Sequence, residues 1–266
     1  MMEAQGLGEA AERLRRATVR VLDGMPETRG SGSGVIWTSD GTVVTNAHVA
    51  RGEAARVELW DGSGMRAEVV SRDERRDLAR LKIPATRLPA AEWRDSGSLR
   101  AGEVLIAVGN PLGFVGALAT GVAHASGPVR GLGRRSWVQA AIRLAPGNSG
   151  GPLADAAGRV VGINTMAAGR LALAIPSETV ARFVEHGAPP ALGVTLQPVP
   201  QGLLVLQVSR GSPAERASLL PGDLLVGFDS PDDLRAAIDS GGPIHLKFRR
   251  GDRRAIREVA VDPRVH

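Results

Sequence analysis

The chain has 266 residues, 43% of them apolar and 23% charged, which excludes a disordered chain and leaves room for two domains or one large all-β domain. It has no cysteine, which excludes disulfides and thiolate metal sites, and an aromatic fraction of 3% leaves Val, Leu, Ile and Ala to build the core. The net charge of +5 permits a polyanionic partner, but the arginines are scattered and no aromatic residue interrupts their clusters, so we expect no nucleic-acid partner.

The N-terminal region predicts a helix followed by a first strand. Residues 7–16 have helical character, and the alternation in residues 17–22 is typical of a strand. We treat residues 1–16 as an N-terminal helical segment. The region lacks the apolar core of a secretory signal, and no run of about 18 apolar residues follows, so no membrane span is expected. The expected location is the cytoplasm, with the periplasm or the extracellular space as alternatives.

Residues 32–49, GSGVIWTSDGTVVTNAHV, read as two strands joined by a turn at Ser39, Asp40 and Gly41. Further short apolar runs continue the pattern without helices between them, which argues against a parallel α/β sheet. Closely spaced short strands of this kind predict a sandwich or a barrel. The further predicted strands are residues 55–60, 65–73, 78–83, 103–109, 117–126, 136–144, 158–165 and 171–176.

Residues 177–187 predict a helix that closes this first domain. Ser177 is a candidate N-cap, and Gly187 is a typical stop. The Pro-rich stretch that follows predicts a domain boundary. We therefore divide the chain into the N-terminal segment, a domain of residues 17–187, a linker of residues 188–190 and a second domain of residues 191–262. The second domain alternates five short strands with two helices, which is a small α/β module.

Three residues in chain order suggest nucleophilic catalysis. His48 follows a strand-like run, Asp77 stands at the entry of the next apolar strand, and Ser149 lies in the glycine-rich stretch PGNSGGPL. Taken singly, His48 could be a structural histidine and Asp77 a turn or cap residue. Peptide hydrolysis by a serine needs a nucleophile, a base and an acid that orients the base, and the order His, Asp, Ser is that of the chymotrypsin arrangement.

The glycine-rich stretch itself predicts an oxyanion hole. Glycines permit a tight turn in which the backbone N–H groups of Gly147 and Ser149 point at one spot. A phosphate-binding loop is the competing interpretation. It is rejected because no Lys-Ser/Thr pair and no helical run follow the glycines.

These motifs resemble the HtrA (Deg) family of serine proteases, from about residue 17 to residue 262. The resemblance rests on residues 32–49, on DLARLKI, GNPLG and PGNSGGPL, and on GINTM with LALAIPSETV. It implies a mainly β chain, with a chymotrypsin-like double β-barrel protease domain followed by a small α/β PDZ domain. It makes His48 the general base, Asp77 its orienting carboxylate and Ser149 the nucleophile, with the N–H groups of Gly147 and Ser149 as oxyanion donors.

The resemblance also assigns a specificity pocket. Leu144 occupies the position that lines the pocket in the family, which implies cleavage after small or medium aliphatic residues. Arg143 replaces a residue that is usually small, and would favour acidic residues if it pointed into the pocket. Asn164 and Thr165 are assigned to the same pocket, in a strand that can pair with the substrate backbone.

The PDZ assignment places a carboxylate-binding loop at Leu192, Gly193 and Val194, so that the C-terminal peptides of other proteins would bind there. Unfolded polypeptides are the implied substrates. Family members commonly form trimers through N-terminal aromatic residues; this chain has none before Trp37, which weakens the expectation of a homotrimer.

The function predicted from the sequence is therefore a serine endopeptidase that cleaves unfolded or misfolded proteins in protein quality control. The alternative is an inert protease-fold scaffold or chaperone that binds peptides through its PDZ domain. No metal and no other cofactor is expected, because no histidine has a second candidate ligand in a short motif.

Overall fold

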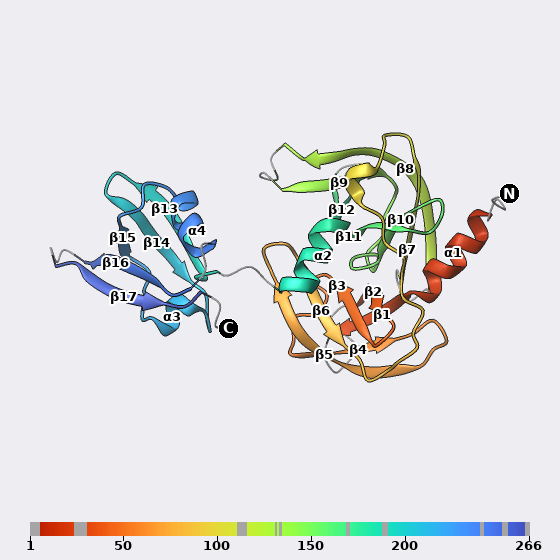
Figure 1. The fold of residues 1–266 in the computed structure, drawn as a ribbon, viewed down its shortest axis with the longest axis horizontal. Helices are drawn as coiled ribbons and strands as arrows, with labels where there is room; N and C mark the ends of the chain where they lie inside the picture. Colours follow the sequence, from red (N-terminus) through yellow and green to blue (C-terminus); the bar gives the residue numbers. More distant parts are fainter. Residues whose placement is uncertain are drawn as a thin grey trace. The chain divides into compact units, whose positions relative to one another are not determined.

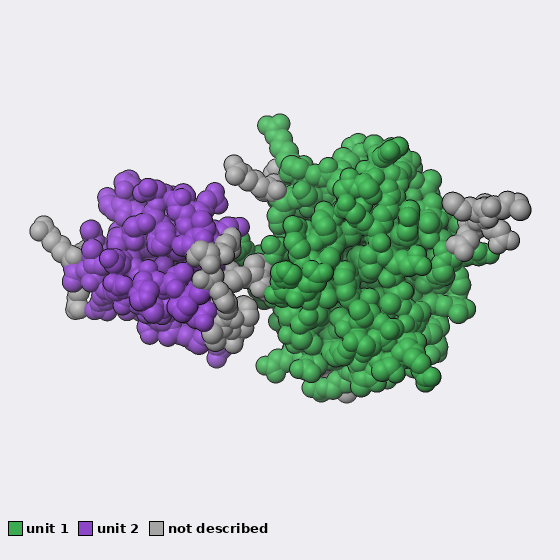
Figure 2. Space-filling view, in the orientation of Figure 1, with its two compact units in different colours: residues 1–188 green, residues 189–266 purple. Residues whose placement is uncertain are grey.

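The computed structural model describes residues 6–23, 31–110, 116–130, 132, 135–168, 171–187, 191–239, 242–251 and 255–263. The chain forms two compact units, residues 1–188 and residues 189–266 (Figures 1 and 2). The predicted linker, residues 188–190, lies outside the described residues. No helix in the described ranges is both long and apolar enough to cross a bilayer.

The first unit begins with a closed antiparallel barrel of six strands in the order β1-β2-β3-β6-β5-β4. Inward-facing Val, Ile, Leu and Ala side chains fill it, as the low aromatic content predicted. The predicted hairpin at Asp40 and Gly41 is present and joins β2 to β3. The strands are β1 (Thr18–Asp23), β2 (Ser31–Thr38), β3 (Thr42–Thr45), β4 (Ala54–Glu58), β5 (Gly64–Asp73) and β6 (Leu78–Lys82).

A second closed barrel of six strands follows, in the order β10-β11-β12-β9-β8-β7, so the mainly β fold is confirmed. Strand β10 was not predicted. It is four residues long and begins with a proline, and it is held by pairing with β7 on one side and β11 on the other. The strands are β7 (Val104–Gly109), β8 (Ala117–Pro128), β9 (Ser136–Ala141), β10 (Pro152–Asp155), β11 (Val160–Ala168) and β12 (Leu171–Pro176).

Two helices pack on these barrels. Helix α1 (Leu7–Arg16) buries Ala10 and Leu14 against apolar residues of the second barrel, and lies beside β7 in Figure 1. Helix α2 (Ser177–His186) ends at Gly187, as predicted. The expectation that Ser177 caps α2 is wrong. Its hydroxyl donates to the Arg94 carbonyl and accepts from Ser96 N–H, so it ties the segment before β7 to the helix instead.

The second unit is a five-stranded antiparallel sheet in sequence order with two short helices, which matches the small α/β module predicted for this part of the chain. Its core is built from Leu and Val of the sheet and Phe248 of β16, together with Leu234 and Ile238 of α4. The elements are β13 (Val194–Val199), β14 (Gly202–Val208), α3 (Pro213–Arg216), β15 (Asp223–Val226), α4 (Pro231–Asp239), β16 (Ile244–Arg250) and β17 (Arg257–Val261).

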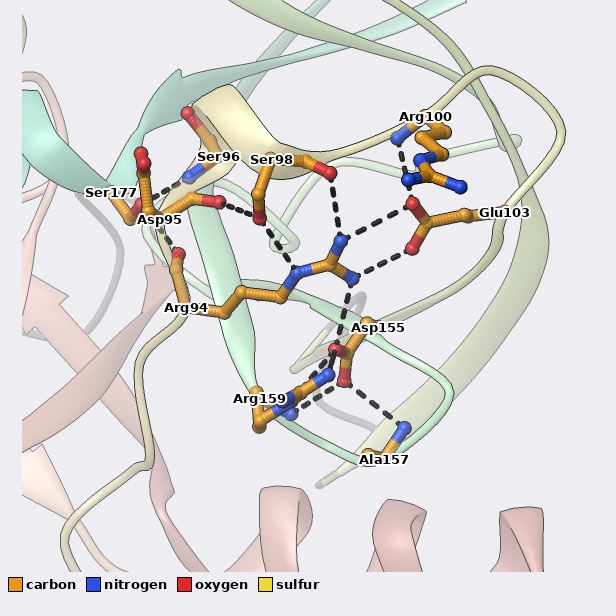
Figure 3. Close-up of polar contacts among 10 residues, drawn as sticks. All are labelled: Arg94, Asp95, Ser96, Ser98, Arg100, Glu103, Asp155, Ala157, Arg159 and Ser177. Atoms are coloured by element: carbon orange, nitrogen blue, oxygen red, sulfur yellow. Dashed lines mark hydrogen bonds and ion pairs between the residues drawn. The ribbon is translucent and has the colours of Figure 1, made fainter.

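A charge network fixes the segment that connects the two barrels (Figure 3). The Arg94 guanidinium donates to both carboxylate oxygens of Glu103, at 2.6 and 3.2 Å, and to Asp155 at 3.2 Å. Its remaining N–H groups donate to the hydroxyl and the carbonyl of Ser98, so all five are used. Arg159 donates to Asp155 from the other side, at 2.7 and 2.9 Å. The connector is thereby tied to the turn between β10 and β11.

These contacts make the first unit sensitive to acid. Hydrogen bonds from Arg94 and from Arg100 N–H lower the pKa of Glu103 from 4.5 to about 2. Burial acts to raise the pKa of Asp155, but hydrogen bonds from Arg159 and Arg94 outweigh it and the pKa is lowered. Because both pKa values are depressed in the folded state, the stabilisation is complete above about pH 4.5 and is lost as the pH falls towards about 2.

We expect Glu103→Gln to lower the free energy of unfolding at pH 7 by about 2 kcal/mol, because hydrogen bonds to a charged partner are lost. The loss of stability between about pH 4.5 and 2 should be shallower than in the wild type. Urea unfolding followed by tryptophan fluorescence measures this, since all four tryptophans lie in the first unit. Glu68→Gln, at an exposed glutamate of β5, is the control. Equal acid dependence in the wild type and in Glu103→Gln would contradict the prediction.

Candidate active site

The sequence-predicted base and acid meet at the edge of the first barrel. His48 lies in the turn after β3, and Asp77 directly precedes β6. His48 Nδ1 is 2.8 Å from Asp77 Oδ2, and the backbone N–H of His48 donates to Asp77 Oδ1 at 3.0 Å. Asn46 holds the Asp77 backbone by donating to its carbonyl at 2.9 Å. Asp77 therefore forms hydrogen bonds with both the ring and the backbone of His48.

Thr165 of β11 links this pair to the second barrel. Its hydroxyl donates to Asp77 Oδ2 at 2.5 Å, and its carbonyl accepts from the Ser149 hydroxyl at 3.1 Å. Thr165 was predicted in the specificity pocket; in the structure it lies between the carboxylate and the serine. A lone Thr in a strand carries no signal of this contact, because 88 residues separate it from Asp77.

Burial and hydrogen bonding act in opposite directions on Asp77. Burial raises the pKa of its carboxyl group, while hydrogen bonds from His48 and Thr165 lower it. The hydrogen bonds together prevail, so the pKa is lowered below its ordinary value. Asp77 is thus an ionised carboxylate and can accept a hydrogen bond from His48 Nδ1–H. This bond fixes the imidazole ring so that Nε2 points away from Asp77.

Ser149 lies in the loop between β9 and β10, which crosses close under the first barrel. A Cβ at Gly150 would lie 2.0 Å from the Ser33 carbonyl oxygen, and the φ of Gly150 is +84°, so only glycine fits there. The Ser149 hydroxyl has the Thr165 carbonyl as its partner, and no hydrogen bond joins it to His48 among the described residues. In this arrangement the Ser149 hydroxyl must leave the Thr165 carbonyl before it can donate to His48.

The same loop presents two free backbone donors. The N–H groups of Asn148, Gly150 and Gly151 donate to carbonyls of this loop or of β11. Those of Gly147 and Ser149 have no hydrogen-bond partner within the described part of the chain. Two unpaired N–H groups beside a serine hydroxyl can stabilise the negative charge that develops on a carbonyl oxygen during acyl transfer.

The predicted pocket residues have different environments. Leu144 is half-buried against the core of the second barrel. Arg143 is exposed, and no carboxylate of the described residues pairs with it. Asn164 is fully buried and donates through its side chain to the Pro152 carbonyl at 2.9 Å. On the β10 side of β11, pairing covers Val160 to Ile163, and within the described residues no strand pairs with the backbone beyond Thr165 on this side. An extended peptide can pair with such an edge.

The residues predicted to bind a C-terminal carboxylate lie at the start of the second unit's sheet. The Leu192 carbonyl accepts from Ala214 N–H, and the Gly193 carbonyl accepts from Ser209 N–H. The N–H groups of Leu192 and Gly193 have no partner within the described residues, and Val194 begins β13. Separately, the described residues contain no group of three or more His, Asp or Glu side chains arranged to hold a metal ion.

Known proteins are similar to this chain in sequence and in fold. The model of the trypsin-like peptidase domain matches residues 32–163. A Synechocystis sp. protein named as the serine protease HhoB is 34% identical, over 90% of this chain and 68% of that protein. A DegP-like periplasmic serine endoprotease of Hahella chejuensis is 36% identical, over 77% of this chain and 50% of its own length. The chain thus spans about half the length of its DegP-like relative.

Solved structures are similar over both units. The serine endoprotease from Yersinia pestis superimposes with a TM-score of 0.68 at 26% identity, covering 97% of this chain and 98% of that one. The HtrA-type protease AlgW with a decapeptide gives a TM-score of 0.64 at 27% identity, with coverage of 97% and 98%.

Proposed function

The chain belongs to the HtrA (Deg) family of trypsin-like serine endopeptidases, and on that premise we propose that it cleaves unfolded polypeptides through His48, Asp77 and Ser149. The observation that carries the proposal is the connected set of contacts from His48 through Asp77 and Thr165 to Ser149, beside the two free N–H groups of the loop. A structural histidine would not need an acid and a serine aligned in this way.

The reaction follows from these groups. The Ser149 hydroxyl turns from the Thr165 carbonyl to His48 Nε2, gives up its proton there and attacks the peptide carbonyl carbon. The N–H groups of Gly147 and Ser149 bind the oxyanion of the tetrahedral intermediate. His48 then gives the proton to the leaving amine, and the acyl group stays on Ser149 Oγ. Water, deprotonated by His48 in the same way, hydrolyses the ester and restores the serine.

The substrate side is an extended chain. The open edge of β11 beyond Thr165 suits a polypeptide that pairs through its backbone and carries little sequence information. Unfolded proteins expose such backbone, whereas folded proteins use it internally. This supports a role in protein quality control. The DegP-like relatives are named periplasmic, and we propose the periplasm for this chain in place of the cytoplasm expected from the sequence.

The test is to incubate the chain with a permanently unfolded polypeptide and to identify the cut bonds by mass spectrometry. Leu144 predicts cuts after Val, Ala or Leu. Cuts after Asp or Glu would instead assign the exposed Arg143 to the pocket. No cuts, together with no labelling of Ser149 by a fluorophosphonate, would contradict the protease proposal and favour the peptide-binding scaffold.

For the second unit we propose a PDZ domain that binds the C-terminal carboxylate of a peptide at Leu192, Gly193 and Val194. The support is that the carbonyls of Leu192 and Gly193 are used within the unit while their N–H groups are unpaired. A carboxylate has acceptors alone and suits such a nest of donors. The fold of five strands and two helices fits this family of domains.

We expect Gly193→Ala to weaken binding of a peptide with a free C-terminal carboxylate by about tenfold or more. A Cβ at Gly193 would lie 2.3 Å from Ser212 Cβ, which displaces the loop. Gly211→Ala is the matched control, because the φ values are +74° and +72° but the space at Gly211 is open. Fluorescence anisotropy with the Ser149→Ala chain avoids cleavage of the peptide. Equal affinity in the two glycine variants, or equal binding of the C-terminal amide, would contradict the carboxylate site.

A further inference from the structure

Ser33 of β2 reaches across from the first barrel to the loop that carries the nucleophile. It is completely buried. Its hydroxyl donates to the Gly147 carbonyl at 2.7 Å, and its backbone N–H donates to the Ser149 carbonyl at 2.8 Å. One residue of the first barrel therefore holds the loop on both sides of Asn148.

The direction of the hydroxyl bond is settled by its other partners. Ser33 Oγ is 2.9 Å from the backbone N of Asn110 and 3.3 Å from its side-chain Nδ2. Both are donors, so the oxygen accepts from them and its own hydrogen goes to the Gly147 carbonyl, which can act as an acceptor alone. Asn110 belongs to the GNPLG motif and is itself anchored, because Nδ2 donates to the Val19 carbonyl at 3.0 Å.

The position of this bond within the loop is what gives it a catalytic consequence. The Gly147 carbonyl belongs to the peptide unit that lies between the two free N–H groups, those of Gly147 and Ser149. The two donors belong to the peptide units on either side of it, so a shift of this central unit would change how the donors are directed relative to one another. Within the loop this unit is held at its N–H end, because Asn148 N–H donates to the Ala145 carbonyl at 3.1 Å. Its carbonyl end is held from outside the loop, by the Ser33 hydroxyl at 2.7 Å and by a longer contact from Asn110 N–H at 3.4 Å.

We propose that Ser33 is a positioning residue for the oxyanion hole: its hydroxyl, directed by Asn110, fixes the Gly147–Asn148 peptide so that the N–H groups of Gly147 and Ser149 converge. The proposal rests on the proposed protease function. Donors held in advance at the site of developing charge stabilise the transition state more than the bound substrate, so Ser33 should act on kcat rather than on KM.

The test is Ser33→Ala, assayed with a fluorogenic peptide cut by the wild type. We expect kcat to fall by about 10- to 100-fold, less than the loss on removal of an oxyanion donor, which is about 100- to 1,000-fold. KM should stay within about twofold. The inhibition constant of a peptide aldehyde of the same sequence should rise in parallel with the loss in kcat, because the aldehyde adduct carries an oxyanion.

The aldehyde separates positioning from general destabilisation. A variant that is merely less folded contains fewer active molecules, which lowers the apparent kcat but leaves an inhibition constant unchanged. Thr18→Val is the matched control: it also removes one buried hydroxyl, which donates to Leu14 O at 2.8 Å, away from the loop. It should keep the wild-type kcat and inhibition constant.

Wild-type kcat and wild-type aldehyde inhibition in Ser33→Ala would overturn the role of Ser33 while leaving the protease function intact. An inactive wild type whose Ser149 is not labelled by a fluorophosphonate would overturn both. Should Ser33→Ala fail to fold, Ser33→Cys fills the same place with a weak donor. The same parallel loss of kcat and aldehyde affinity is expected, and its absence would equally overturn the proposal.

Discussion

Ser149→Ala is expected to lower kcat for peptide cleavage by about a millionfold while the chain stays folded. Without the hydroxyl no acyl-enzyme can form, and this loss corresponds to roughly 8 kcal/mol of the activation barrier. The residual rate would come from the free N–H groups of the loop and from peptide binding, neither of which depends on the side chain. The measurement is the initial rate of cleavage of an unfolded polypeptide, quantified by mass spectrometry.

Folding should be nearly unaffected by Ser149→Ala. The substitution removes one hydrogen bond of 3.1 Å, to the Thr165 carbonyl, and creates no strain because the backbone of Ser149 is unchanged. Ser126→Ala, at an exposed serine of β8, is the control and should retain full activity. A fluorophosphonate should label the wild type and the control but not Ser149→Ala. Cleavage by Ser149→Ala at the wild-type rate would remove Ser149 from the mechanism.

Local sequence signals predicted most of the secondary structure correctly. Asp40 and Gly41 between two β-branched runs predicted the β2–β3 hairpin, because turn chemistry and strand alternation act over a few residues. The sequence did not predict strand β10, because the strand is short and begins with Pro152. Its stability comes from pairing with β7 and β11, and this pairing is not evident from the local sequence. The cap predicted at Ser177 was wrong for a similar reason: its hydroxyl donates to the carbonyl of Arg94, which lies 83 residues away.

The candidate site shows the same division. Chain order and turn glycines selected His48, Asp77 and Ser149, because these residue types are the ones that the proposed base, acid and nucleophile require. The contacts that join them depend on ordinary residues from distant parts of the chain. Thr165 reaches Asp77, and Ser33 reaches Gly147 across 114 residues. Nothing in the local sequence distinguishes these hydroxyls from others, because their contacts form only when the two barrels have folded and lie against each other.

Asp77→Asn is expected to lower kcat by about ten-thousandfold with little change in KM. Asp77 accepts hydrogen bonds from His48 Nδ1, from the His48 backbone and from Thr165. An asparagine has a single acceptor oxygen, so it can accept from the donors on one side of the original carboxylate and not from those on the other. If the new amide donates to Nδ1, the imidazole holds its proton on Nε2 and can no longer take one from Ser149. Steady-state kinetics at saturating peptide measure the loss.

The best control is an equivalent substitution at the end of β5, just before the turn that carries Asp77. Asp73 is also buried and paired, with Arg76 at 2.9 Å, but it has no contact with His48 among its hydrogen bonds. Asp73→Asn should therefore lower stability and leave kcat within a few-fold of the wild type. Because Asp77 is kept ionised by His48 and Thr165 against its burial, its replacement changes the tautomer of the base and not merely a surface charge. Comparable kcat values for Asp77→Asn and Asp73→Asn would show that the carboxylate serves the fold of the loop, and the orienting role would have to be abandoned.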